Sequence, residues 1–270
     1  MPIKTKTGSE SSILSVGVYR PDRLVPNSEI VAAIDSSDEW IVQRTGIESR
    51  RIASAEESVV DMAIGAAEQA LSRAKLTIKD IDSVIVATIT YPHQAPSAAT
   101  AIIQRMGNPT AAAFDIGAAC AGFCYGVAMA HDFVRAGSSK KVLVIGVEKI
   151  SDFTDPTDRA TAFIFADGAG AVIIGESDDA GIGPVEWGSD SENRDAILMN
   201  PSWIDVRDTQ TQLSKADVKW PNITQEGQKV FRWAVFSMSK AALKALNSAG
   251  LSVNDLDAFI PHQANVRIIE

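Results

Sequence analysis

Hydrophobic and polar positions along the chain follow two alternating periodicities. Short apolar runs rich in β-branched residues, typical of buried strands, alternate with longer segments whose apolar residues recur every three or four positions, typical of helices. The strand-like runs are DSVIVATI (82–89), AAAFDIGA (111–118), KVLVIGVE (141–148) and AGAVIIGE (169–176), and the helical segments include residues 58–74 and 120–137. This alternation predicts an α/β fold with helices packed on both faces of a sheet.

An internal repeat relates two distant parts of the chain. Residues 70–86 (ALSRAKLTIKDIDSVIV) align without gaps to residues 245–261 (ALNSAGLSVNDLDAFIP), an offset of 175 positions (245 minus 70). Each copy has the pattern of a helix, a turn, a short acidic connector and a strand. The matched lengths and the shared D-[IL]-D element favour duplication over chance similarity between two helix–strand units.

The repeat predicts a duplicated architecture with halves at residues 1–178 and 179–270. By symmetry the counterpart of Cys120 would fall near position 295 (120 plus 175), so we expect the second half to be incomplete. Residues 189–225 are polar, weakly periodic and rich in turn formers. They predict an excursion without regular structure, which in a compact domain is usually functional or mobile.

Composition narrows the class of protein. The chain has 270 residues, of which 46% are apolar and 22% charged, and contains no run of eighteen apolar residues that would predict a membrane span. Its polar N-terminus does not have the pattern of a secretion signal, and two cysteines four positions apart do not make a disulfide framework. We therefore expect a cytoplasmic protein. The net charge of −9 argues against nonspecific nucleic-acid binding, and the spacing of cysteines and histidines predicts no metal site.

Cys120 is placed where a strand pattern ends and a helix pattern begins. Unpaired backbone N–H groups and the helix dipole at such a position lower a thiol pKa and favour a nucleophilic thiolate. The small neighbours Ala118, Ala119 and Gly122 leave room for a ligand, and their N–H groups could bind an oxyanion. The alternative is a buried structural cysteine, which is the interpretation we favour for Cys124.

A cysteine nucleophile usually works with an imidazole. His131 lies within a helical pattern and is expected to be structural, and the position of His93 after a strand leaves its role open. His262 follows the predicted strand of the second repeat. Because strand ends from two halves of a duplicated fold approach one another, His262 is the best candidate partner for Cys120.

Five motifs in order resemble the thiolase superfamily, most closely the β-ketoacyl-acyl-carrier-protein synthase III family. They are SSDEWIVQRTGI (36–47), AACAGF (118–123), DPTDRATAFIFADGAGAV (155–172), GQKVFRWAV (227–235) and PHQANVRI (261–268). The resemblance runs along essentially the whole chain. It implies a duplicated α/β/α/β/α sandwich with mixed five-stranded sheets, of which the second half is incomplete here.

The resemblance also implies a condensing acyltransferase that starts fatty-acid synthesis. Cys120 would take the acyl group of an acyl-CoA primer, and malonyl-carrier-protein would then lose CO₂ and attack the acyl-cysteine, giving a 3-ketoacyl-carrier-protein. His262 would donate a hydrogen bond to the thioester oxygen. Acyl-CoA and malonyl-carrier-protein are substrates in this scheme, and no cofactor is implied. The family pairs its histidine with an asparagine in a GNTS-like loop, and that sequence does not occur in these 270 residues.

The binding residues implied by the resemblance follow the same motifs. Trp40 and Arg44, four positions apart on a predicted helix, match positions that hold the adenine of CoA. Core packing is the alternative for Trp40, and a solvated charge is the alternative for Arg159. The full set of binding positions carried over is Ser36, Trp40, Arg44, Arg159, Gly227, Phe231, Asn265 and Arg267.

The family further implies a homodimer and docking of the acidic carrier protein on a basic surface near Arg267. A partner loop closes the acyl pocket, and the corresponding stretch is HQAPSAAT (93–100). Ala95 stands where some relatives carry phenylalanine, so we expect a primer longer or bulkier than acetyl. Two alternatives remain: a related thiolase-fold acyltransferase or ketide synthase of secondary metabolism, and a noncatalytic interaction paralogue.

Overall fold

The computed structural model describes residues 6–210 and 219–269, and the chain divides into two compact units. The first unit takes residues up to 23, 51–149 and 167–185, and the second takes 24–50, 150–166 and 186–270. Each unit draws on both predicted halves. The boundary at residues 178 and 179 concerns the duplication and stays a prediction.

A mixed five-stranded sheet forms the centre of the first unit, as the sequence predicts. Its order is β1 (Glu10–Tyr19), β7 (Gly168–Ser177), β6 (Lys141–Glu148), β4 (Ser83–Ala87) and β5 (Ala112–Ile116). β4 pairs in parallel with both β5 and β6, whereas β7 pairs antiparallel with β6 and β1. All five residues of β4 are buried, which explains its uninterrupted apolar sequence.

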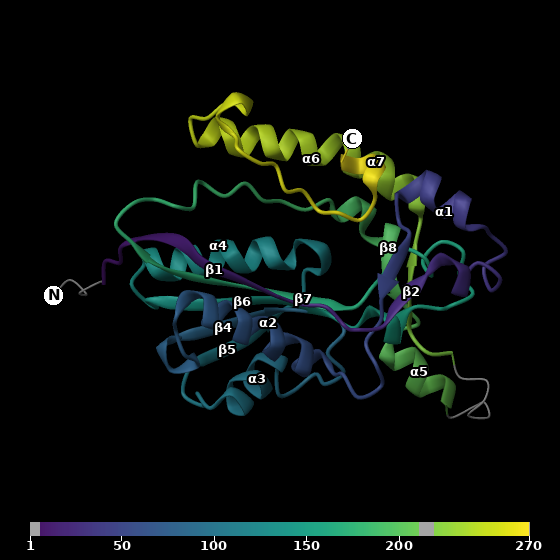
Figure 1. Ribbon diagram of the computed structural model, residues 1–270, viewed down its shortest axis with the longest axis horizontal. Helices are drawn as coiled ribbons and strands as arrows, with labels where there is room; N and C mark the ends of the chain where they lie inside the picture. The colour runs from purple at the N-terminus through teal and green to yellow at the C-terminus, as the bar shows by residue number, and fades with distance from the viewer. Residues whose placement is uncertain (1–5, 211–218, 270) are drawn as a thin grey trace. The chain divides into compact units, whose positions relative to one another are not determined.

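Helices cover both faces of this sheet. Figure 1 shows α2 (Val59–Ala74) and α3 (Ala98–Met106) on one face and α4 (Gly122–Arg135) on the other. The chain leaves α4 through Gly137, whose φ of 70° lies in the left-handed region, so the predicted helix stop is confirmed. The two faces bury separate apolar clusters, one under α2 and α3 and one under α4.

Small residues bring α4 close to the sheet. A Cβ on Gly126 would lie 2.7 Å from Val144 Cγ1, and one on Gly122 would lie 2.9 Å from the Cβ of Ala87. Replacing either glycine would therefore push the first turns of α4 away from the strand ends.

His131 lies further along the same face of α4 and is buried. Its Nδ1 lies 2.7 Å from the hydroxyl oxygen of Ser11, so its predicted structural role is confirmed.

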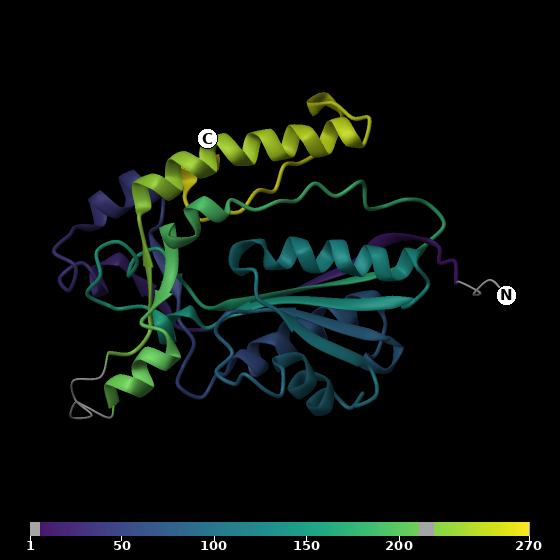
Figure 2. The same ribbon diagram turned by 180° about the vertical axis from the view of Figure 1, so that it is seen from behind.

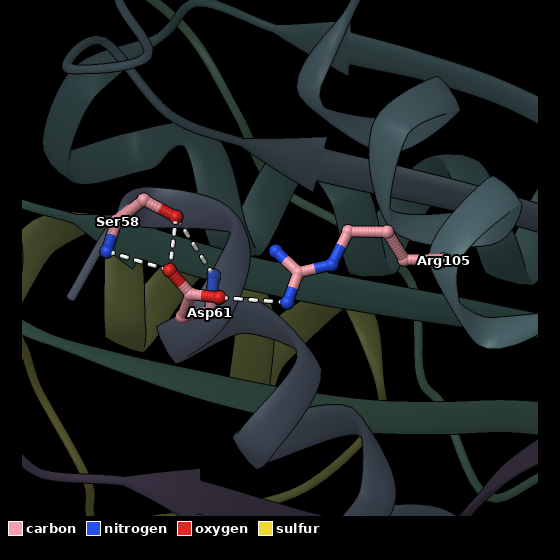
Figure 3. Close-up of polar contacts among 3 residues, drawn as sticks. All are labelled: Ser58, Asp61 and Arg105. Atoms are coloured by element: carbon pink, nitrogen blue, oxygen red, sulfur yellow. Dashed lines mark hydrogen bonds and ion pairs between the residues drawn. The ribbon is translucent and has the colours of Figure 1, made fainter. Parts of the chain in front are cut away.

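Reciprocal capping fixes the start of α2. Figure 3 shows the Ser58 backbone N–H donating to the Asp61 carboxylate at 2.8 Å while the Asp61 N–H donates back to the Ser58 hydroxyl at 3.2 Å. Arg105 of α3 donates to the other Asp61 oxygen at 2.7 Å. The hydrogen bond from the Ser58 side chain contributes most to lowering the pKa of Asp61 to about 2.

The second unit contains short strands, helices and one long helix. Near its N-terminal part lie β2 (Leu24–Pro26), β3 (Ser49–Arg51), the 3-10 helix η1 (Asn27–Glu29) and α1 (Asp38–Thr45). The later elements are the 3-10 helices η4 (Ile150–Phe153) and η5 (Ser191–Ala196), strands β8 (Ile197–Asn200) and β9 (Asn222–Gln225), and helices α5 (Trp203–Gln210), α6 (Gly227–Ser248) and α7 (Val266–Ile269).

The prediction of an excursion without regular structure at residues 189–225 is wrong for the described part of that segment. β8 and β9 pair antiparallel from Ile197 opposite Gln225 to Asn200 opposite Asn222. The Trp203 and Trp220 rings meet edge to face at 5.2 Å, and the Trp220 ring N–H donates to the Asp152 carbonyl at 2.9 Å. Aromatic packing and non-local pairing organise a segment in which local periodicity is weak. Residues 211–218 lie outside the described residues.

The two copies of the internal repeat have the same local structure except in their last element, the strand. Lys75 after α2 and Gly250 after α6 both have left-handed φ values, 56° and 70°. The 3-10 helices η2 (Ile78–Asp80) and η7 (Val253–Asp255) follow, each with its own capping box. The predicted second strand is absent, because residues 257–262 have no strand assignment and no ladder partner among the described residues. Figure 2 shows this stretch returning alongside α6.

Candidate functional site

Cys120 lies between a strand and a helix, as predicted. β5 ends at Ile116, the one-turn 3-10 helix η3 (Ala119–Ala121) follows, and α4 begins at Gly122. Ala119 has a φ of 44°, and a residue with a Cβ held in this left-handed region carries strain of roughly 1–3 kcal/mol. The fold therefore imposes a tight turn directly before the candidate nucleophile, and the Cys120 residue is exposed.

A cavity of about 230 Å³ opens beside the Cys120 thiol. Its walls come from the ends of β4, β6 and β7 and from the turn before α4. The lining residues are Ala87, Ala119, Cys120, Phe123, Gly146, Val147, Glu148, Gly168, Ala169 and Gly170. Small side chains keep this space open, and a Cβ on Gly170 would meet no atom within 4 Å. The cavity can hold a short, apolar group attached to the sulfur.

The pKa of the Cys120 thiol is raised, which corrects the prediction of a preformed thiolate. Although the residue as a whole is exposed, desolvation of the sulfur beside the cavity walls is the main cause, and the Glu148 carboxylate adds repulsion. A hydrogen bond from the backbone N–H of Cys120 acts in the opposite direction but does not outweigh them. The thiol is therefore protonated at neutral pH and must lose its proton as it reacts.

Cys124 is exposed, so its prediction as a buried cysteine is also wrong. It lies one turn into α4 but away from the face that packs on the sheet. That buried face is formed by Gly122, Gly126, Ala128, Ala130, His131 and Val134.

His262 belongs to the second unit and lies in the stretch without regular structure between η7 and α7. The residue as a whole is exposed, although the neighbouring chain partly surrounds its ring. Partial desolvation by the surrounding protein lowers the pKa of the imidazole. A lowered pKa disfavours the imidazolium form, so the ring is neutral at neutral pH and can donate one hydrogen bond.

Helix α1 builds an aromatic and cationic surface in the second unit. The Ser37 hydroxyl caps the helix by accepting the Trp40 N–H at 3.1 Å, and Gly46 ends it with a φ of 73°. The spacing of four places Trp40 and Arg44 on one face. The guanidinium carbon of Arg44 lies 4.7 Å from the centre of the Trp40 ring, and that of Arg159 lies 4.9 Å from it.

Two aspartate turns hold the segment that carries Arg159. Asp155 accepts hydrogen bonds from the Thr157 N–H and hydroxyl at 2.8 and 2.7 Å, and its carboxyl pKa is lowered chiefly by the bond from the Thr157 side chain. Asp158 accepts from the Ala160 N–H at 2.8 Å. Asx turns of this kind fix a loop locally, so the DPTDRA motif gives Arg159 a defined position.

A second cavity, of about 340 Å³, surrounds this surface. It is lined by Trp40, Arg44, Thr45, Arg159, Ala160, Phe163, Ile164, Gln225, Gly227, Gln228, Val230, Phe231, Asn265, Arg267 and Ile268. Seven of the eight predicted binding residues therefore line one cavity. Among its described lining residues are three arginines and no carboxylate, which suits an anionic ligand with a flat ring.

Ser36 is the predicted binding residue that does not line this cavity. Its hydroxyl oxygen is buried and has no hydrogen-bond partner among the described residues. It lies just before the cap of α1, so sequence proximity to Trp40 does not bring its side chain to the cavity wall.

Two residues near these sites, Arg50 and Glu148, were not predicted from the sequence. Arg50 is buried and donates to the Asn27 side chain at 2.5 Å and to the Phe163 carbonyl at 3.2 Å, while Phe163 packs edge to face on Trp40. Arg50 thus supports the Trp40 surface from behind. Glu148 at the Cys120 cavity was also missed, although a charge at the end of a buried strand is a signal that could have identified it.

The chain is similar in sequence to known β-ketoacyl-acyl-carrier-protein synthases. The family model for 3-oxoacyl-[acyl-carrier-protein (ACP)] synthase III matches residues 114–191. β-Ketoacyl-[acyl-carrier-protein] synthase III 1 of Streptomyces coelicolor is 52% identical over 274 residues, covering 99% of this chain and 80% of the relative. The chain belongs to the β-ketoacyl-acyl-carrier-protein synthase III family. The mycobacterial synthase III of Mycobacterium marinum is 47% identical over 269 residues, covering 99% of this chain and 78% of the relative.

Solved structures of synthase III relatives give the same fold. The priming β-ketosynthase of the R1128 polyketide pathway matches with a TM-score of 0.94 and 42% identity, covering 100% of this chain and 79% of that one. The synthase III of Aquifex aeolicus matches with a TM-score of 0.79 and 37% identity, covering 96% and 78%. The predicted family, thiolase-like fold and condensing acyltransferase activity are confirmed. The roles of individual site residues stay predictions.

Proposed function

We propose that Cys120 and His262 carry the two catalytic roles of this synthase III. In the first step the Cys120 sulfur attacks the thioester carbon of an acyl-CoA. The sulfur–acyl bond to Cys120 forms, the bond to the CoA sulfur breaks, and the thiol proton leaves with CoA as its thiol. The cavity beside the Cys120 thiol is the observation that carries this assignment. The backbone N–H of Cys120 is the proposed donor to the oxyanion.

The second step is decarboxylative condensation with malonyl-carrier-protein. Loss of CO₂ leaves an electron pair on the α-carbon and negative charge on the thioester oxygen. A neutral His262 donates a hydrogen bond to that oxygen, and its lowered pKa favours the neutral form. The α-carbon then attacks the acyl-cysteine carbonyl, the Cys120 sulfur leaves, and a 3-ketoacyl-carrier-protein is released.

The cavity at Trp40 is the proposed site for the CoA part of the primer. The adenine ring would stack on Trp40, and Arg44, Arg159 and Arg267 would face the phosphate groups of CoA. Gly227 leaves open space at the cavity wall, where a Cβ would meet no atom within 4 Å. The pantetheine arm would lie along a wall that includes Gly227, Phe231 and Asn265. Ser36 does not line this cavity, so we assign it no contact with CoA.

Carrier-protein docking, a homodimer and a cytoplasmic location complete the proposal. Arg267 is exposed and donates to the Gln43 carbonyl at 2.6 Å, which fixes a cation at the surface for an acidic partner. β5 is an edge strand of its sheet, so its outer N–H and C=O groups are available to a second copy. No helix of the described residues is long and apolar enough to cross a membrane.

Acylation followed by mass spectrometry tests the catalytic roles. The protein is mixed with butyryl-CoA and digested, and the peptide carrying Cys120 is expected to gain the butyryl group. Cys120→Ala should remove the adduct, whereas Cys124→Ala should keep it. His262→Ala should keep acylation but lose most CO₂ release from malonyl-carrier-protein. An adduct that survives Cys120→Ala, or no adduct on folded protein, would refute the assignment and favour a noncatalytic paralogue.

Primer length and acceptor identity are tested separately. The Cys120 cavity has a volume of about 230 Å³, which supports a primer longer than acetyl. In a series of acyl-CoA primers, the protein should therefore react faster with chains longer than two carbons, and a sharp preference for acetyl-CoA would contradict this.

The likeness to a polyketide priming ketosynthase favours a second candidate function, the priming of a ketide pathway. Competition between fatty-acid and polyketide carrier proteins separates the two.

A further inference from the structure

The cavity beside Cys120 contains one charged wall residue, Glu148, at the end of β6. Of the described lining residues, the others apart from Cys120 are alanine, glycine, valine or phenylalanine. Glu148 is half-buried, so its charge acts across a partly desolvated space. The reaction scheme above assigns this carboxyl group no role, and its surroundings indicate what it does.

The hydrogen bonds around Glu148 favour its carboxylate form. Its Oε1 accepts from the Ile89 N–H at 2.9 Å, and its Oε2 accepts from the hydroxyls of Thr90 at 2.5 Å and Thr88 at 3.2 Å. Each hydroxyl in turn accepts a backbone N–H, from Lys149 at 2.9 Å and from Thr90 at 3.3 Å. Each hydroxyl thus keeps its own proton available for Oε2, and the hydrogen bonds from Ile89, Thr90 and Thr88 all bring donors to this carboxyl group.

Two opposing effects act on the ionisation of Glu148. Burial raises the pKa of the carboxyl group, and the donors from Thr90, Ile89 and Thr88 oppose that rise by stabilising the charged form. The Glu148 charge also raises the pKa of the Cys120 thiol, so the two groups interact electrostatically across the cavity.

We propose that Glu148 makes the Cys120 cavity select uncharged acyl groups and reject primers whose chain ends in a carboxylate, such as the succinyl group. This inference rests on the proposed function, because selection operates only if Cys120 accepts the acyl group. A terminal carboxylate entering the cavity would meet a fixed like charge, and the cavity's alanine, valine and phenylalanine side chains carry no cation to compensate it. Specificity here comes from a repulsive element in addition to apolar fit.

The selection acts on the primer and leaves the extender step untouched. In acylation the Cys120 sulfur–acyl bond forms, the CoA sulfur–acyl bond breaks, and the proton of Cys120 leaves with the CoA thiol. The chain carried by the acyl group then fills the cavity. When malonyl-carrier-protein arrives, its carboxylate is therefore kept out of the space that Glu148 borders.

Three CoA thioesters that share a four-carbon acyl backbone test the proposal on the unaltered protein. Butyryl-CoA, succinyl-CoA and the terminal methyl ester of succinyl-CoA share the CoA group and differ only at the chain end. The initial rate at which each acylates Cys120 is followed by mass spectrometry. The ester and butyryl-CoA are expected to react at least about tenfold faster than succinyl-CoA, because a like charge facing Glu148 disfavours the charged chain. Equal rates for succinyl-CoA and its ester would overturn the selection.

The variant Glu148→Gln then assigns the effect to this residue. Glutamine keeps the side-chain shape and an acceptor for the Ile89 N–H but removes the charge. The ratio of succinyl to butyryl acylation should rise about tenfold, whereas Glu176→Gln, an exposed charge removal on β7, should leave the ratio unchanged. An unchanged ratio in a Glu148→Gln protein that still accepts butyryl-CoA overturns the proposal.

These experiments distinguish failure of the proposed acylation of Cys120 from failure of the proposed role of Glu148. Loss of all acylation by butyryl-CoA in the unaltered protein would overturn the proposed function and this proposal with it. Acylation by butyryl-CoA with no discrimination against succinyl-CoA would overturn only the role of Glu148. If Glu148→Gln fails to fold, the comparison of succinyl-CoA with its methyl ester still decides whether the cavity rejects a charge.

Discussion

The two copies of the internal repeat, one running through α2 into β4 and the other through the end of α6, can be compared position by position. At the offset of 175, Lys75 corresponds to Gly250 and both adopt the left-handed conformation that ends a helix. The Thr77–Asp80 and Ser252–Asp255 capping boxes also correspond. Signals that act within a few residues therefore produce the same local structure twice.

The copies differ where structure depends on distant neighbours. Ile78 is 8% exposed and its counterpart Val253 is 60% exposed, while Ile85 is 0% exposed and its counterpart Ile260 is 82% exposed. Ile85 lies in β4, which pairs on one side with β5 and on the other with β6. No described strand pairs with the segment around Ile260. A strand thus needs partners far along the chain, whereas a cap needs only its own turn.

The largest expected effect comes from truncating the matched isoleucines. Ile85→Ala should destabilise the first unit by about 2–5 kcal/mol, because it leaves a void in a close-packed core. Ile260→Ala should change stability by about 0.5 kcal/mol or less, because the side chain is exposed. Urea unfolding of the 270-residue chain, followed by circular dichroism, measures both. Similar losses at the two positions would contradict the difference in packing described here.

The elements that sequence patterns predicted correctly are those with strong local or periodic signals. The apolar runs of β4, β5, β6 and β7 and the helical periodicities of α2 and α4 are found where expected. The spacing of Trp40 and Arg44 likewise brought both residues to one cavity. In each case the signal depends on residues within one element.

The predictions that failed depend on contacts between elements. A helix start alone suggested a low thiol pKa for Cys120, but the desolvation and the Glu148 charge that raise it come from the cavity walls and from β6. The strand expected at residues 257–262 lacks partners, and the β8–β9 pair joins segments more than twenty positions apart. The local sequence pattern does not contain this information, because desolvation, a neighbouring charge and strand pairing all depend on residues that only folding brings close.

A smaller effect is expected from substituting the left-handed residue at each of the two helix ends. Lys75→Gly should stabilise the protein by about 0.5–1 kcal/mol, because glycine adopts a positive φ without the Cβ penalty that lysine carries. Gly250→Ala should destabilise it by about 1 kcal/mol for the same reason with the opposite sign. A Cβ at Gly250 would meet no atom within 4 Å, so only the backbone term contributes. Thermal unfolding of both variants shows whether each substitution raises or lowers stability. A change in the same direction for both would contradict a shared left-handed geometry at the two helix ends.

The smallest effect sharpens the comparison at the helix start, where the copies diverge. α2 begins at the Ser58–Asp61 capping box, whereas the position matching Asp61 is Phe236, inside α6. Asp61→Asn should cost about 0.5–1 kcal/mol at neutral pH, a modest value because the side chain is partly exposed. Exposed Glu68→Gln on the same helix is the matched control.

The pH dependence of this difference follows from the direction of the Asp61 shift. The folded pKa of about 2 lies below the ordinary 3.8, so the carboxylate contributes its full stabilisation above pH 3.8 and loses it as pH falls through about 2. The stability gap between the unaltered protein and Asp61→Asn should therefore stay constant down to about pH 5 and close between about pH 4 and 2. Urea titrations across this range measure the gap. A gap that persists at pH 2 would mean that Asp61 stabilises α2 by packing and not by its charge.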